Sequence, residues 1–229
     1  MCYGQARSTE VGEKMESISE MVTEIHVAAL NLASTYGIFH GMNDAIGDEK
    51  IPSGRPSQAI AVIQNDLIHT IAFRVCALCE ESNRRDDANM SVVLKSLDDQ
   101  KFCDALIEKD RRWRAKVLPR PTTHPDAAFN IQSLRERWAN LKGKRESMDR
   151  IRHLRNKKLG HVTVGFQKEN RAVLHELWTL AKETLSVAEG IRLVFADTDC
   201  RYHEAIDSYH RDGRALIDAL RTEFVCRNF

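Results

Sequence analysis

The sequence predicts an all-α protein, a helical bundle with additional helices. The chain has only five prolines and 11 glycines among its 229 residues, which leaves long stretches without helix breakers. Within those stretches, apolar residues recur every three or four positions, the spacing of one helix face. The sequence contains no convincing run of alternating apolar and polar residues that would indicate a strand.

Two amphipathic patterns open the chain, from Met15 to about His40 and from Ser57 to about Glu81. We expect one face of each helix to enter a core. The apolar positions are Ile18, Met21, Val22, Ile25, Ala29, Leu32 and Tyr36 in the first and Ile60, Ile63, Leu67, Ile71, Val75 and Leu78 in the second. Between them, GDEKIPSGRPS predicts a loop, and Ser57 is placed to cap the second helix.

The middle of the chain predicts a shorter helix followed by a loop. The helical pattern runs from about Ser91 to Lys116. VLPRPTTHPD then holds three of the five prolines, which cannot continue a helix. We expect a single domain over residues 1–229, with the proline-rich loop 117–126 as a candidate sub-boundary.

Three helical patterns follow this loop. The longest begins at Pro125 and Asp126 and stops near Gly160, a residue type that favours helix termination. VTVGFQKEN is then a short connection. Two more helices are predicted, at about Arg171–Ala196 and Tyr202–Phe224.

Composition narrows the location and the classes of partner. With 34 basic and 33 acidic residues the net charge is +1, so any attraction to phosphate must come from a local cluster. No apolar run in the sequence approaches the roughly 18 residues of a membrane helix. The N-terminal MCYGQARSTEVGEK lacks the apolar centre of a signal peptide. We therefore expect a cytoplasmic protein without a membrane partner.

The sequence does not favour metal or redox chemistry. The CALC motif, Cys76 to Cys79, lies inside a predicted helix without a second cysteine pair, so core packing is the better interpretation. His203 and His210 lie close to two aspartates and a cysteine but lack the tight spacing of zinc ligands, which favours surface or capping roles. We expect no metal and no cofactor.

A basic segment, DRIRHLRNKKLGH, ends the longest predicted helix. Its cations are Arg150, Arg152, Arg155, Lys157 and Lys158. One interpretation is a solvated helix end, because cations complement the dipole at a helix C-terminus. The other interpretation is a site that acts on phosphate.

The residue types in this segment suit metal-free cleavage of RNA. A histidine such as His161 can take the proton of the ribose 2′-hydroxyl. The planar guanidinium of Arg155 can hold two phosphate oxygens, and the polar Asn156 can orient either group. In a continuous helix, however, Arg155 and His161 would lie roughly 120° apart around the axis. The helix must therefore bend or end near Gly160, or each side chain must work with its counterpart in a second subunit.

The stretch LRNKKLGH, Leu154 to His161, resembles the motif of the HEPN superfamily, an arginine and a polar residue followed by a histidine. The residues of this stretch are most similar to those of the abortive-infection type U branch, AbiU. IAFRVCALCEES and NMSVVLKSL add a looser similarity to that branch. The resemblance implies a HEPN-like helical bundle, consistent with the fold class above.

The resemblance also implies a function. Many HEPN proteins are metal-independent endoribonucleases, and their products carry a 2′,3′-cyclic phosphate. The implied catalytic residues are Arg155, Asn156 and His161, and the implied RNA-binding residues are Arg152, Lys157 and Lys158. The resemblance further implies a homodimer with a composite active site. It also implies a role in phage defence or in a toxin–antitoxin system, with an antitoxin as a possible partner. The alternative is a non-catalytic module of the same fold that binds nucleotide, RNA or protein.

Overall fold

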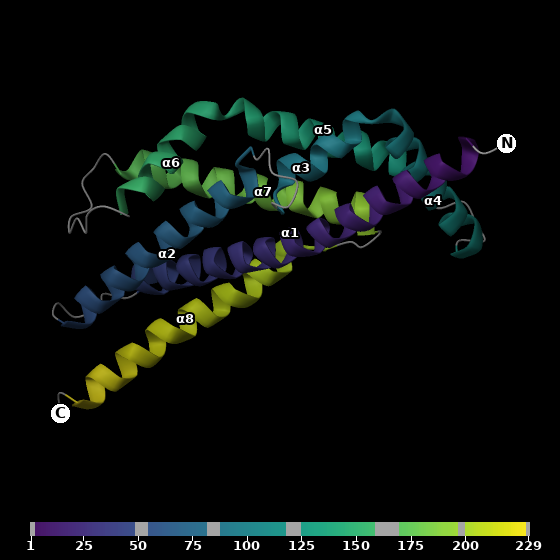
Figure 1. Cartoon of the computed structure of the whole chain (residues 1–229). Helices are drawn as coiled ribbons and strands as arrows, with labels where there is room; N and C mark the ends of the chain where they lie inside the picture. Colours follow the sequence, from purple (N-terminus) through teal and green to yellow (C-terminus); the bar gives the residue numbers. More distant parts are fainter. Residues whose placement is uncertain are drawn as a thin grey trace. The chain divides into compact units, whose positions relative to one another are not determined.

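The computed structural model describes residues 3–48, 55–81, 88–117, 125–158, 170–196 and 200–227. All regular structure in these residues is helical (Figure 1), which confirms the all-α fold class. In chain order the elements are α1 (Tyr3–Asp48), α2 (Arg55–Cys79), α3 (Met90–Lys95), the 3₁₀ turn η1 (Ser96–Asp98), α4 (Gln100–Val117), α5 (Ala127–Gly143), α6 (Arg145–Lys158), α7 (Asn170–Ala196) and α8 (Tyr202–Arg227).

The first two predicted helices are confirmed, with changes at their ends. Every predicted apolar position of α1 is buried except Met21, which is half-buried. In α2, Ile63 was also predicted to face the core, but its side chain is 37% exposed. The predicted cap at Ser57 is wrong, because α2 begins at Arg55 and Ser57 lies inside it. Pro56 follows Arg55, and the first turn is the part of a helix where proline is tolerated.

The single helix predicted from Ser91 to Lys116 is wrong, because the chain forms α3, η1 and α4 there. Asn89 caps α3, with its side-chain oxygen accepting the Val92 N–H at 3.1 Å. Asp99 then takes an extended conformation with φ −85° and ψ 107°. Its carboxylate accepts the N–H groups of Lys101 at 3.1 Å and Phe102 at 3.4 Å, so Asp99 starts a new helix.

The longest predicted helix is also divided, into α5 and α6. Asp126 caps α5 by accepting the Phe129 N–H at 2.9 Å. The helix ends at Gly143, and Lys144 leaves the helical region with φ −88° and ψ 40°. The structure describes α6 as far as Lys158, so the predicted helix end near Gly160 lies outside the described residues.

The chain divides into two compact units, and α1, α2 and α7 contribute residues to both. The first unit comprises Met1–Ala28, Ala77–Lys144 and Ser186–Cys200, and the second comprises Ala29–Cys76, Arg145–Leu185 and Arg201–Phe229. The single domain over residues 1–229, with a sub-boundary at residues 117–126, stays a prediction.

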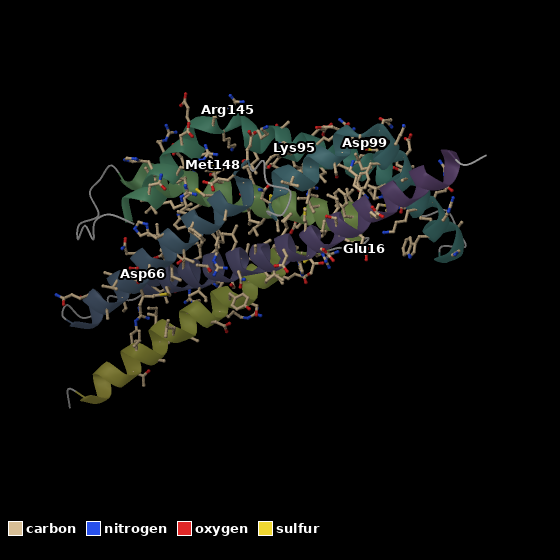
Figure 2. All side chains as sticks on the ribbon, in the orientation of Figure 1. Glu16, Asp66, Lys95, Asp99, Arg145 and Met148 are labelled. Atoms are coloured by element: carbon tan, nitrogen blue, oxygen red, sulfur yellow. The ribbon has the colours of Figure 1, made fainter. Side chains whose placement is uncertain are left out.

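In the first unit, the core joins α4, α5 and α7. The rings of Phe102 on α4 and Phe195 on α7 lie 6.2 Å apart. Leu134 on α5 packs where Gly190 of α7 has no side chain; a Cβ at Gly190 would stand 3.0 Å from it. Figure 2 labels Asp99, whose carboxylate binds Lys14 of α1 at 2.9 Å. This ion pair connects the start of α4 to α1.

In the second unit, α8 passes close to α1 (Figure 1). A buried cluster of Met42, Ala45, Ile60 and Ile217 joins α1, α2 and α8. Beside it, the backbones approach through glycines: a Cβ on Gly41 would clash with the backbone of His210, and one on Gly213 with the backbone of Ile38. The absence of side chains at these positions is therefore a condition for the contact between α1 and α8.

One stretch of α2, Ser57–Cys79, is apolar enough to match a membrane span by length and composition, with a mean hydropathy of 1.2 over 18 residues. The sequence-based statement that no run approaches this size is therefore wrong. Core helices of soluble proteins pass the same test, so the finding is weak evidence for a membrane.

An aromatic cluster in the second unit surrounds His40. Its imidazole lies 4.4 Å from the Tyr36 ring and 5.4 Å from the Trp178 ring, measured between centroids. Among the described residues, its buried Nε2 has no hydrogen-bond partner. Burial lowers the pKa of His40 from its usual 6.5; positive charge on Lys182 and His210 adds to this shift, and Asp44 opposes it.

Gly41→Ala is expected to lower the free energy of unfolding by ~1–3 kcal/mol, because backbone atoms of α8 must move to admit the methyl group. Gly47→Ala is the matched control on the same helix, since no heavy atom lies within 4 Å of its added Cβ. This control is expected to change stability by less than roughly 0.5–1 kcal/mol, the gain from alanine in a helix interior, because Gly47 lies in the last turn of α1. Urea titration measures both; equal effects would contradict the close contact.

The His40 cluster predicts a pH dependence of stability. Because its pKa is lowered in the folded protein, the unfolded chain binds the proton more tightly, and stability falls as the pH drops below about 6.5. His40→Phe removes this titration and should flatten the fall measured between pH 7 and 5 by urea titration. Part of the slope should remain, because burial also lowers the pKa of His26. The control is His203→Asn, an exposed position on α8; an unchanged slope in His40→Phe argues against the interpretation.

Candidate functional site

The candidate site lies at the C-terminal end of α6, in the second unit. One side of α6 enters the core through Met148 and Ile151, which are 7% and 0% exposed. Arg145 and Met148 mark the first turn of this helix in Figure 2. The same helix contains six basic residues and two acidic ones, a formal charge of +4.

An ion pair holds α6 to α7. Arg150 donates from Nε to one Glu176 oxygen at 2.8 Å and from Nη2 to the other at 2.7 Å. This two-bond geometry fixes direction as well as distance. The hydrogen bond with Glu176 raises the pKa of Arg150 above its usual value. Sequence reasoning missed Glu176, because a single acidic residue on another helix carries no local signal.

On the last turn of α6, Arg155 and Asn156 are in contact. The Arg155 Nε–H donates to the Asn156 side-chain oxygen at 3.1 Å. Arg155 is half-buried and Asn156 is exposed. A guanidinium carries five N–H donors, and this contact uses one of them. The amide can therefore orient the guanidinium.

The remaining predicted residues differ in how far the structure describes them. Arg152 donates to Asp149 at 2.8 Å, so part of its charge is compensated within the helix. Lys157 and Lys158 are the last residues of α6, and their side chains lie outside the described part. His161 lies outside the described residues altogether. The structure thus brings Arg155 and Asn156 together and does not test their distance from His161.

The cysteine and histidine candidates elsewhere take ordinary structural positions. Cys76 and Cys79 are 0% and 7% exposed, which confirms that the CALC motif packs in a core. His203 is exposed, and His210 contacts Asp44 of α1 at 2.8 Å. Among the described residues, no group of three or more His, Cys, Asp or Glu side chains is arranged to hold a metal ion.

The model of the AbiU2 family of HEPN proteins matches residues 15–216. This match runs from α1 into α8 and contains the whole basic segment at the end of α6. The chain belongs to the AbiU2 HEPN family. Searches of the curated proteins and of the solved structures found no significant match. The family assignment identifies a HEPN-type abortive-infection protein.

Removing the α7 anchor of this AbiU2 helix should loosen α6 selectively. In Glu176→Gln the charge-assisted pair with Arg150 is lost, so α6 amides are expected to exchange hydrogen severalfold faster while Tm falls only slightly. Glu146→Gln is the matched control, since its carboxylate is 91% exposed and 3.9 Å from Arg150. Mass-spectrometric hydrogen exchange reads both variants. Equal exchange rates of the α6 amides in the two variants would contradict the role of the Arg150–Glu176 pair as an anchor.

Proposed function

We propose that this AbiU2 protein is a metal-independent endoribonuclease. The observation that carries the proposal is the 3.1 Å contact between Arg155 and Asn156 on the last turn of α6. Membership of the AbiU2 HEPN family supports it. These two residues also resemble the arginine and polar positions of the HEPN motif. The third motif residue is His161.

Each motif residue has one task in the proposed reaction. His161 takes the proton of the ribose 2′-hydroxyl, and the 2′-oxygen forms a bond to the adjacent phosphorus. The bond from phosphorus to the 5′-oxygen breaks, and the leaving oxygen takes up a proton from water. Arg155 stabilises the negative charge that develops on the phosphoryl oxygens, and Asn156 orients its guanidinium. The products are a 2′,3′-cyclic phosphate and a 5′-hydroxyl.

RNA is the proposed substrate, and Arg152, Lys157 and Lys158 are its proposed flanking phosphate contacts. A second copy of the chain is the proposed partner, because Arg155 and His161 would face apart on one continuous helix and two copies can compose a site. The proposed setting is antiviral defence by abortive infection or a toxin–antitoxin system, in which an antitoxin would restrain the nuclease. The proposed location is the cytoplasm.

The test compares RNA cleavage in EDTA by the purified protein and its variants. Arg155→Ala is expected to lower the rate roughly 10²–10³-fold through lost charge stabilisation, and His161→Ala roughly 10²–10⁴-fold through lost proton transfer. Asn156→Ala should cost less, because the guanidinium remains. Product ends are identified by mass spectrometry, with 2′,3′-cyclic phosphates expected.

Arg145→Ala is the matched control, since Arg145 is an exposed cation on the first turn of the same helix. It should retain the rate of the unaltered protein. Equal cleavage by all variants would falsify the assignment of the catalytic residues. Loss of activity in EDTA alone would remove the metal-independent part. RNA binding without cyclic ends would favour the alternative, a non-catalytic HEPN module.

A further inference from the structure

A second basic surface lies on α4, in the first unit and away from the HEPN motif in the sequence. Lys109, Arg112, Trp113 and Lys116 recur at i, i+3, i+4 and i+7, which places them on one side of the helix. We call this set the α4 face. All four side chains are exposed, with Trp113 at 42% and the Arg112 side chain at 75%.

The segment of α4 that carries this face has an excess of positive charge. From Glu108 to Lys116 there are five basic and two acidic residues, a formal charge of +3 in a chain whose total is +1. Glu108 divides its carboxylate between Arg111 at 3.0 Å and Arg112 at 2.8 Å. One negative charge therefore serves two guanidinium groups, and both remain about three-quarters exposed.

An exposed indole among cations narrows the class of ligand. Trp113 is the one tryptophan among the exposed large apolar side chains of the described residues. Cations alone would attract any polyanion. A flat aromatic ring beside them suits single-stranded nucleic acid, because bases stack on aromatic rings while cations hold the backbone phosphates.

Polar contacts connect the inner side of α4 to the start of α5. Asp110, which is 9% exposed, pairs with Arg114 on the inner side of α4 and accepts the Ala127 N–H at 3.1 Å. Arg114 also donates to the Pro125 carbonyl oxygen. These contacts hold the start of α5 against α4. They also fix the first turn of α5, where Phe129 is 61% exposed.

We propose that the α4 face binds single-stranded RNA, with Trp113 stacking on a base and Arg112 and Lys116 contacting phosphates. This inference rests on the proposed function for the identity of the ligand. The α4 face would add an RNA contact that is remote in sequence from the cleavage motif. The surface is a binding site and takes no part in the cleavage chemistry.

The experiment measures binding of the full chain to a fluorescent 2′-O-methyl oligouridine by anisotropy. This probe lacks the attacking hydroxyl, so binding is read without cleavage, and it is longer than the roughly 4–16 nucleotides that a single-strand site covers. Trp113→Ala is expected to weaken binding roughly five- to 150-fold at an unchanged salt dependence, and Trp113→Phe to restore most of it. The double variant Arg112→Ala, Lys116→Ala should lower the slope of log affinity against log salt by about 1.4.

Two controls remove similar side chains elsewhere. Phe73→Ala deletes a 60% exposed ring on α2, and a double variant, Lys95→Ala with Arg211→Ala, deletes two exposed cations on α3 and α8. Both should bind like the unaltered chain. The proposal is overturned if the unaltered chain does not bind the probe or if the α4 variants bind as it does. It is also overturned if polyglutamate binds equally well and Trp113→Ala changes nothing, a result that identifies an acidic protein partner.

Cleavage of unmodified RNA separates this inference from the proposed function. If the unaltered chain cleaves RNA and the α4 variants bind and cleave alike, the α4 face fails and the nuclease stands. If the α4 variants lose binding while no chain cleaves RNA, the nuclease fails and the α4 face stands.

Discussion

The candidate site depends on how α6 is held within the second unit. An isolated helix of 14 residues is marginal in water, so its neighbours must fix its position and rotation. Met148 and Ile151 bury apolar surface of α6, but the hydrophobic effect is non-directional and does not by itself fix the orientation of a side chain. The bidentate pair between Arg150 and Glu176 supplies direction. Arg155 lies five residues beyond Arg150, so its orientation follows from that anchor.

Helix periodicity predicted the fold class well because burial of one face imposes the same spacing on the sequence. The breaks were not predictable in this way. At Asp99 and Lys144 the chain leaves the helical conformation over one residue, and so short an interruption barely changes the apolar spacing on either side. Local chemistry does mark both places. The Asp99 carboxylate accepts two backbone N–H groups of the residues that follow it, and Gly143 precedes Lys144. Periodicity alone gives these signals too little weight.

The site shows a similar division between local and distant information. Arg155 and Asn156 are neighbours in sequence, so the motif itself identified their contact. Glu176 could not be identified, because its role comes from packing between α6 and α7. The same holds for Gly41 and Gly213, which sequence reasoning treats as helix-weakening residues. In the second unit they allow two backbones to approach, and this packing offsets their low helix propensity.

Charge in this chain is arranged locally, since the total is close to zero. On both α4 and α6 the cations outnumber the acids, and each helix also carries acids that bind particular cations: Glu108 and Asp110 on α4, and Asp149 on α6. Such pairs limit repulsion among neighbouring cations and fix some side chains, but they do not remove the local excess. A long-range field would attract any polyanion and is screened beyond roughly 8–10 Å at physiological salt. Local clusters instead act at contact distance, where the geometry of Arg155 with Asn156 or the ring of Trp113 can discriminate among ligands. Near-neutral total charge is therefore consistent with a protein whose attraction for phosphate is confined to particular surfaces.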